Sequence, residues 1–240
     1  MSAPTVVLVH GAFADSASWT GVIERLRRHD VPVVAVANPL RSLRGDARYV
    51  RDVVASIEGP VVLVGHSYGG SVITEAASGS AEVVALVYVA AFAPDHDESA
   101  LALSGRFPGS TLGDALATYP VADGTELAIR QDRFPAQFAA DVEPDTAALM
   151  AATQRPVLEA ALTEGLPTDE PAWEHVPSWF VLAGDDRNIP AAAIRWMADR
   201  AQARSLVEVP GASHAVAVSH PDDVADVVLA AIAAYSSVAA

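Results

Sequence analysis

The chain has 240 residues, of which 51% are hydrophobic and 19% charged, a composition typical of a globular protein with one sizeable core. Its formal net charge of -15 repels phosphate backbones and anionic lipid heads, so we expect neither nucleic-acid nor membrane binding. The sequence holds no cysteine and no lysine. This excludes a thiol nucleophile, a Cys-based metal site and a Schiff-base or P-loop lysine.

The longest apolar run, residues 83–93, has 11 residues, whereas a spanning helix needs ~20. Residues 1–5 carry no basic segment ahead of the first apolar run, so we do not expect a cleaved secretion signal. The sequence therefore predicts a cytoplasmic protein. A homodimer is compatible with these features and is left open.

Short β-branched runs recur through the first part of the chain and predict buried strands of a parallel sheet, because they are apolar on both faces. They lie at Val6–Val9, Val33–Val36, Val61–Val64 and Val83–Val89. Segments of helical period separate them, as in the crossovers of βαβ units. The first such helix is expected to begin near Ser16 or Ser18.

From Pro94 to about Pro171 the apolar runs shorten and prolines and glycines scatter, which predicts an inserted, mostly helical cap with a weak helix over residues 145–162. After the cap, predicted strands and helices alternate again. We expect strands at 178–183 and 205–209, and helices at 191–203 and 221–235. The predicted fold is α/β, a doubly wound, mostly parallel sheet of about six strands. Residues 1–93 and 172–240 would form the core, and residues 94–171 the cap, inserted after the fourth strand.

The most informative motif is Gly65-His66-Ser67-Tyr68-Gly69-Gly70, which follows one predicted strand and precedes a helical segment. This is G-x-S-x-G in the strand–turn–helix context of a nucleophile elbow. A nucleophile on so tight a turn adopts strained backbone angles, and flanking glycines remove the Cβ atoms that would collide there. Taken alone, the motif favours a plain strand-to-helix connection in which Ser67 is an N-cap, the commoner role of a serine before a helix.

Three further features favour the elbow. The first is the loop His10-Gly11-Ala12-Phe13 after the first strand, which can aim a backbone N–H at an oxyanion. The expected donors are the N–H groups of Ala12 and Tyr68. We interpret His10 and His66 as structural histidines rather than catalytic ones.

The second feature is an acidic turn after the strand at 178–183, where Asp185 and Asp186 compete to orient a histidine. We favour Asp186, which stands four residues before the proline that opens the next helix. The third is His214, on a glycine-containing loop after the last strand, where it can act as general base and then general acid. His220 is the weaker competitor.

Over residues 4–236 the sequence resembles the α/β-hydrolase superfamily, because Ser67, Asp186 and His214 stand in the order in which that family's Ser, Asp and His occur along the chain. The loop after the first strand and the serine motif further resemble the small capped branch that holds plant-type methyl esterases, hydroxynitrile lyases and bacterial esterases. The resemblance implies an α/β-hydrolase fold, a small-molecule substrate and no metal or organic cofactor.

Departures from neighbouring subfamilies narrow the chemistry that the resemblance implies. The elbow residue is Ser67 and not the aspartate of haloalkane dehalogenases and epoxide hydrolases. Gly11 and Ala215 replace the threonine and lysine of the hydroxynitrile lyases, which favours hydrolysis. A lyase, a cofactor-free haloperoxidase, perhydrolase or oxygenase, and a slow-turnover ligand sensor stay open.

We therefore predict a serine hydrolase of small hydrophobic carboxylic esters that works through an acyl-enzyme. The loops and the cap supply bulky apolar candidates for the pocket wall, although for most of them we rank a role in packing the cap against the core higher. These candidates are Phe13, Tyr119, Phe134, Phe138 and Met150.

Overall fold

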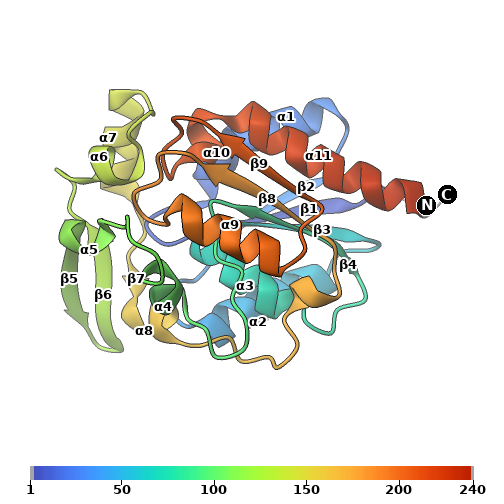
Figure 1. The fold of residues 1–240 in the computed structure, drawn as a ribbon, viewed down its shortest axis with the longest axis horizontal. Coiled ribbons are helices and arrows are strands. Elements are labelled where there is room, and N and C mark those ends of the chain that lie inside the picture. Colours follow the sequence, from blue (N-terminus) through green and yellow to red (C-terminus); the bar gives the residue numbers. More distant parts are fainter. Residues whose placement is uncertain (1–2, 239–240) are drawn as a thin grey trace.

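The fold is a doubly wound α/β sheet, seen in a computed structural model that describes residues 3–238 (Figure 1). Six strands form one parallel sheet in the order β2-β1-β3-β4-β8-β9. Their bounds are β1 (Thr5–Val9), β2 (Val33–Val36), β3 (Val61–His66), β4 (Val83–Val89), β8 (Ser178–Ala183) and β9 (Ser205–Val209). The predicted fold class is confirmed, and each predicted strand lies where the apolar runs placed it.

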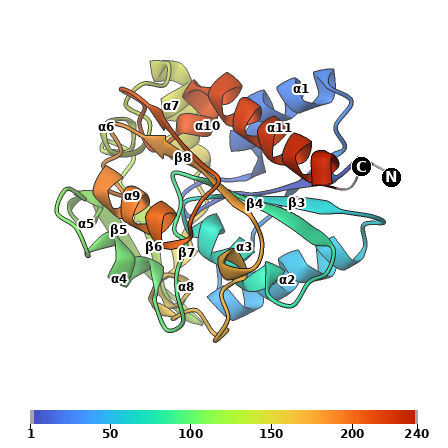
Figure 2. The same cartoon turned by 45° about the vertical axis from the view of Figure 1, so that its right-hand side comes forward.

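Successive residues of the central strands enter two different hydrophobic layers. Val7 and Leu63 pack on one face of the sheet, and Leu8 and Val64 pack on the other. Figures 1 and 2 show α1 and α11 along one face and α2 and α3 along the opposite face. The core helices are η1 (Ser16–Trp19), α1 (Thr20–Arg28), α2 (Leu43–Ala55), α3 (Tyr68–Ala77), η2 (Ala172–Glu174), α9 (Ala191–Arg200), α10 (Val216–Ser219) and α11 (Pro221–Val238).

The insertion between β4 and β8 lies at the end of the sheet opposite to the chain termini (Figure 1). It contains the expected helices and, in addition, a three-stranded antiparallel sheet, β5-β6-β7, which the sequence did not predict. Its elements are α4 (Ala100–Ser104), α5 (Leu112–Ala115), β5 (Leu116–Val121), β6 (Gly124–Ile129), α6 (Phe134–Phe138), α7 (Pro144–Thr153), β7 (Val157–Leu158) and α8 (Glu159–Thr163).

Local turn chemistry explains this difference. Val121 pairs with Gly124 across a two-residue turn, and Gly124 has φ 137°, which favours glycine. The expected helix over 145–162 instead ends at Thr153, because Pro156 restricts the residue before it to extended backbone. The chain then forms β7, which pairs with β6, before α8 begins.

The domain boundaries at residues 94 and 171 stay a prediction. The extreme ends of the expected core, residues 1–2 and 239–240, lie outside the described residues. Over residues 3–238, no helix combines the length and the apolar character that crossing a bilayer would require.

Candidate active site

Ser67 lies on a sharp turn between the end of β3 and the start of α3. Its backbone has φ 53° and ψ -123°, a sparsely populated conformation that costs about 1–3 kcal/mol in a non-glycine residue. Three backbone hydrogen bonds hold it there: its N–H donates to Val89 O at 3.2 Å, and its carbonyl accepts from Gly70 N at 3.0 Å and Phe92 N at 3.2 Å. The turn is thus fixed by its surroundings.

The glycines of the motif allow three chain segments to meet at this turn. A Cβ on Gly65 would lie 2.5 Å from Gly69 O, and one on Gly69 would lie 2.4 Å from Val9 O. A Cβ on Gly11 would lie 2.6 Å from the Cβ of Ser67. Any larger side chain at these positions would therefore displace the serine or the first strand.

The structure pairs His214 with Asp186 in a buried site. His214 Nδ1 lies 2.7 Å from Asp186 Oδ2, and each side chain is only 1% exposed. The other carboxylate oxygen, Oδ1, accepts the backbone N–H groups of Asn188 at 2.7 Å and Ile189 at 3.0 Å. The competing Asp185 is exposed. Of the two candidate aspartates, Asp186 is therefore the one that contacts the histidine.

The second ring nitrogen of His214 is left free. Nε2 is buried and has no hydrogen-bond partner anywhere in residues 3–238, so the bond to the Ser67 hydroxyl is not formed in this structure. The two residues are nevertheless held near each other through His66, which precedes the serine: His66 Nε2–H donates to His214 O at 2.9 Å. Such catalytic hydrogen bonds often form only when substrate binds.

The other histidines that the sequence singled out make different contacts. Burial lowers the pKa of His66 well below its ordinary value, and the neighbouring His214 adds to this effect, so His66 is neutral. Burial also lowers the pKa of His10 to about 4, and its Nδ1 contacts Gly11 O at 2.9 Å. His220 Nε2 lies 3.2 Å from Asp141 Oδ2, and its Nδ1 lies 3.6 Å from Asp223 Oδ2.

The two expected oxyanion donors both border the cavity above Ser67. Within the described part of the chain, the N–H groups of Ala12 and Tyr68 have no hydrogen-bond acceptor. The next N–H along the loop, that of Phe13, is instead occupied by Arg155 O at 3.2 Å. The N–H of Tyr68 also belongs to the first turn of α3, where the helix dipole favours negative charge.

A buried carboxylate beside this turn was not anticipated from the sequence. Asp46 on α2 is completely buried and accepts the Tyr68 hydroxyl at 2.8 Å and the Arg41 N–H at 3.1 Å. Burial raises the pKa of Asp46, while these hydrogen bonds oppose the rise. The sequence did carry a sign that Asp46 is buried, because it lies at helical spacing between the apolar Leu43 and Val50 and so falls on the apolar face of the helix. Asp46 therefore positions Tyr68.

Ser67 opens onto a cavity of about 240 Å³ between the core and the cap. Glu159, at the rim, is the only lining residue within residues 3–238 that is charged at neutral pH. The wall is otherwise mainly apolar, with several leucines that the sequence did not single out. These are Leu101, Leu112, Leu116, Leu127 and Leu162.

Of the five expected pocket residues, only Phe13 lines this cavity. Tyr119 is 49% exposed on β5, where the last four residues are all exposed. Phe134 stacks on Phe138 inside the core, and Phe138 packs edge-to-face on His214 at 4.9 Å between ring centroids. Met150 borders a separate cavity under α7. The other four expected residues therefore do not border this cavity: Phe134 and Phe138 pack in the core, Met150 borders a different cavity, and Tyr119 is exposed.

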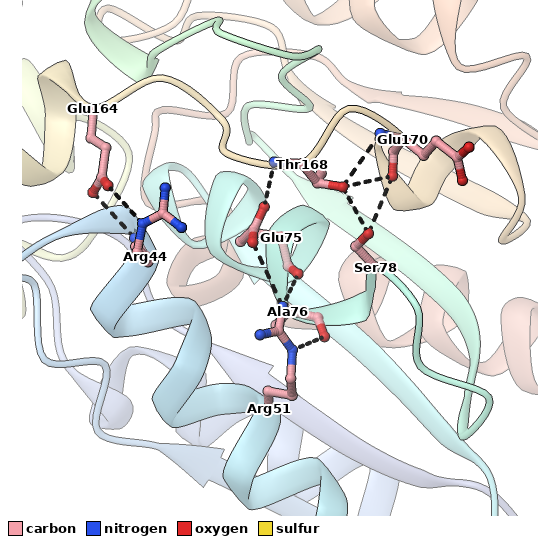
Figure 3. Close-up of polar contacts among 8 residues, drawn as sticks. All are labelled: Arg44, Arg51, Glu75, Ala76, Ser78, Glu164, Thr168 and Glu170. Carbon is pink, nitrogen blue, oxygen red and sulfur yellow. Dashed lines mark hydrogen bonds and ion pairs between the residues drawn. The ribbon is translucent and has the colours of Figure 1, made fainter.

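Polar contacts fasten the segment after α8 to the core (Figure 3). Glu75 on α3 accepts Thr168 N–H at 3.1 Å and pairs with Arg51 of α2 at 3.6 Å. A more exposed pair joins Arg44 and Glu164 at 3.8 Å. These contacts hold the segment that follows α8 against α2 and α3, and α8 itself contributes residues to the cavity rim.

The described residues 3–238 contain no group of three His, Cys, Asp or Glu side chains arranged to hold a metal ion. The chemistry that the site offers is that of a serine, a histidine and a carboxylate beside two free backbone N–H groups. This set can carry out nucleophilic attack on a carbonyl with general acid–base help.

Comparison with known proteins shows the family of this chain. The profile described as "Alpha/beta hydrolase family" matches residues 6–227. The chain belongs to the α/β hydrolase family.

Three curated relatives are similar in sequence. An α/β hydrolase of Aspergillus novofumigatus is 28% identical over 92% of this chain and 94% of its own. An α-hydroxynitrile lyase of Arabidopsis thaliana is 25% identical over 92% of this chain and 93% of its own. A carbendazim-hydrolyzing esterase of a Nocardioides species is 38% identical, over 40% of this chain and 46% of its own. The relatives thus include both an esterase and a lyase.

The fold is also similar to that of solved structures. The crystal structure of polyneuridine aldehyde esterase superposes with a TM-score of 0.81 and 20% identity, covering 95% of this chain and 99% of that one. At this identity the likeness concerns the fold.

Proposed function

We propose that this member of the α/β hydrolase family is a serine hydrolase of small, apolar carboxylic esters. The observation that carries the proposal is the buried pair of His214 and Asp186, in which His214 Nε2 has no partner within residues 3–238 and the His214 carbonyl accepts a hydrogen bond from His66, the residue before the strained Ser67. Asp186 fixes the proton of the imidazole on Nδ1, and therefore leaves Nε2 able to accept one.

In the proposed reaction, Ser67 Oγ attacks the ester carbonyl while His214 Nε2 takes the hydroxyl proton. The carbonyl oxygen becomes an oxyanion that the N–H groups of Ala12 and Tyr68 stabilise. When the tetrahedral intermediate collapses, the ester C–O bond breaks and His214 gives its proton to the departing alcohol. A water molecule, deprotonated by the same nitrogen, then hydrolyses the acyl-enzyme and releases the acid.

The cavity supports a small and apolar substrate. Its volume of about 240 Å³ lies below the ~300–1,000 Å³ usual for sites of drug-sized ligands, and leucines dominate its wall. The esterase among the relatives supports the same class of reaction.

The test is the hydrolysis of a panel of nitrophenyl esters by the wild type and by Ser67→Ala. Ser71→Ala is the matched control, because Ser71 is a buried serine on α3 outside the cavity lining. We expect Ser67→Ala to lower kcat by roughly 10⁴-fold or more, and Ser71→Ala to retain activity. Equal rates of the wild type and Ser67→Ala would refute the proposal.

Cleavage of cyanohydrins is the second candidate, because a hydroxynitrile lyase is similar over most of the chain. The residue after His214 is the buried Ala215, which supplies no cation to stabilise a departing cyanide, so we rank hydrolysis first. Release of cyanide from an aromatic cyanohydrin, with no turnover of any ester, would reverse this ranking.

A further inference from the structure

A second cavity of about 220 Å³ lies beside the catalytic one, between the loop after β1 and α7. Among the described residues that border either cavity, Phe13 alone borders both. Phe13 is only 3% exposed, so it forms the partition between the two spaces.

Phe13 is held in place from both sides. Its backbone has φ 61°, in the left-handed region, and its N–H donates to Arg155 O at 3.2 Å. Arg155 lies between α7 and β7, so the partition joins the loop beside the nucleophile to the cap. A ring fixed in this way closes the side of the catalytic cavity.

The second cavity has an apolar character suited to a hydrocarbon group. Leu149, Met150 and Val218 contribute to its wall, and most of its polar side chains are hydrogen-bonded within the protein. Asp15 Oδ1 accepts Ala17 N–H at 2.8 Å, and Gln154 bonds to the N–H and carbonyl of Ile129 at 2.8 Å each. An alkyl or aryl group can therefore enter this cavity without breaking those hydrogen bonds within the protein.

We propose that Phe13 determines the length of the ester that this site accepts. With its ring in place, the substrate is confined to the catalytic cavity, so the favoured esters are short. Without the ring, the apolar end of a longer ester extends into the second cavity. This inference rests on the proposed esterase function and adds a substrate class to it.

The experiment compares the wild type, Phe13→Ala and Phe13→Ala combined with Ala17→Phe. Ala17 is an exposed residue at the wall of the second cavity, where a phenyl group would fill the space. Two ester series are used, one in which the acyl chain lengthens and one in which the alcohol lengthens. Because burial of a methylene strengthens binding by about fourfold, Phe13→Ala should raise the long-to-short ratio of kcat/KM at least tenfold in one series.

The combined variant should lose that gain, and Ala17→Phe alone should keep the wild-type profile. An unchanged ratio in Phe13→Ala in both series would overturn the inference, and so would a gain that survives Ala17→Phe. If Phe13→Ala does not fold, by circular dichroism, Phe13→Leu must give a smaller shift in the same direction. Absence of ester turnover in the wild type would instead refute the proposed function itself.

Discussion

Replacement of Asp186 by asparagine changes one atom of the site and tests how His214 is oriented. Oδ1 of Asp186 accepts two backbone N–H groups, and Oδ2 accepts His214 Nδ1–H at 2.7 Å. In Asp186→Asn the amide oxygen keeps the two N–H bonds, so the amide nitrogen must face His214. An amide nitrogen only donates, and it therefore forces the histidine proton onto Nε2, which can no longer accept a proton from Ser67.

We expect kcat to fall by about 10⁴-fold, equivalent to ~5.5 kcal/mol of transition-state stabilisation, with KM changed only a fewfold. The fold should persist, because both backbone hydrogen bonds survive and no charge remains unpaired. The assay is steady-state hydrolysis of a short nitrophenyl ester, with urea unfolding as the measure of stability.

The matched control is Asp185→Asn, which makes the same chemical change at the exposed neighbouring position. It should retain activity within a fewfold. A folded Asp186→Asn enzyme with wild-type kcat, or an equal loss in Asp185→Asn, would refute the reasoning about the tautomer.

Three further predictions concern the cap, the cavity rim and pH. Glu75→Ala should lower the free energy of unfolding by about 1.5–3 kcal/mol, because it leaves the Thr168 N–H unpaired. Glu164→Ala removes a more exposed ion pair and should lower it by only ~0–1 kcal/mol. Equal losses for the two variants in urea titrations would contradict this. Glu159→Gln should reduce the preference for a cationic ester over its neutral isostere by about two- to fivefold in kcat/KM at low salt and less at high salt, and a salt-independent ratio would count against a charge effect. Burial lowers the pKa of His10 from 6.5 to about 4, so the unfolded chain takes up the proton at a higher pH than the folded chain does. The free energy of unfolding should therefore drop by up to about 3 kcal/mol between pH 6.5 and 4. His10→Gln should reduce this dependence on pH, and parallel stability curves for the wild type and the variant would refute the prediction.

The sequence predicted the central sheet well because its strands are buried on both faces, and such runs are distinctive. It also predicted the turn at Ser67 and the loops that carry Asp186 and His214, because glycines and strand ends mark them locally. The choice between Asp185 and Asp186 rested on a short motif, and the contact to His214 is what separates them.

Features that depend on packing between distant segments could not be predicted in the same way. The cap sheet is built from short strands, for which the Asp123-Gly124 pair at the end of the turn was the available sign. The pocket wall depends on which cap side chains face Ser67, and aromatic character did not reveal this for Tyr119 or Phe134. The role of Asp46 depends on Tyr68, which is 22 residues away along the chain.

The central claim, that Ser67 is an activated nucleophile, is tested most directly by covalent labelling with a fluorophosphonate. The serine oxygen would bond to phosphorus, fluoride would leave, and His214 would take the proton. We predict that the wild type gains the mass of one phosphonyl group on the peptide that contains Ser67, and that Ser67→Ala gains none. A label on another residue, or an unlabelled enzyme that still hydrolyses esters, would contradict the account.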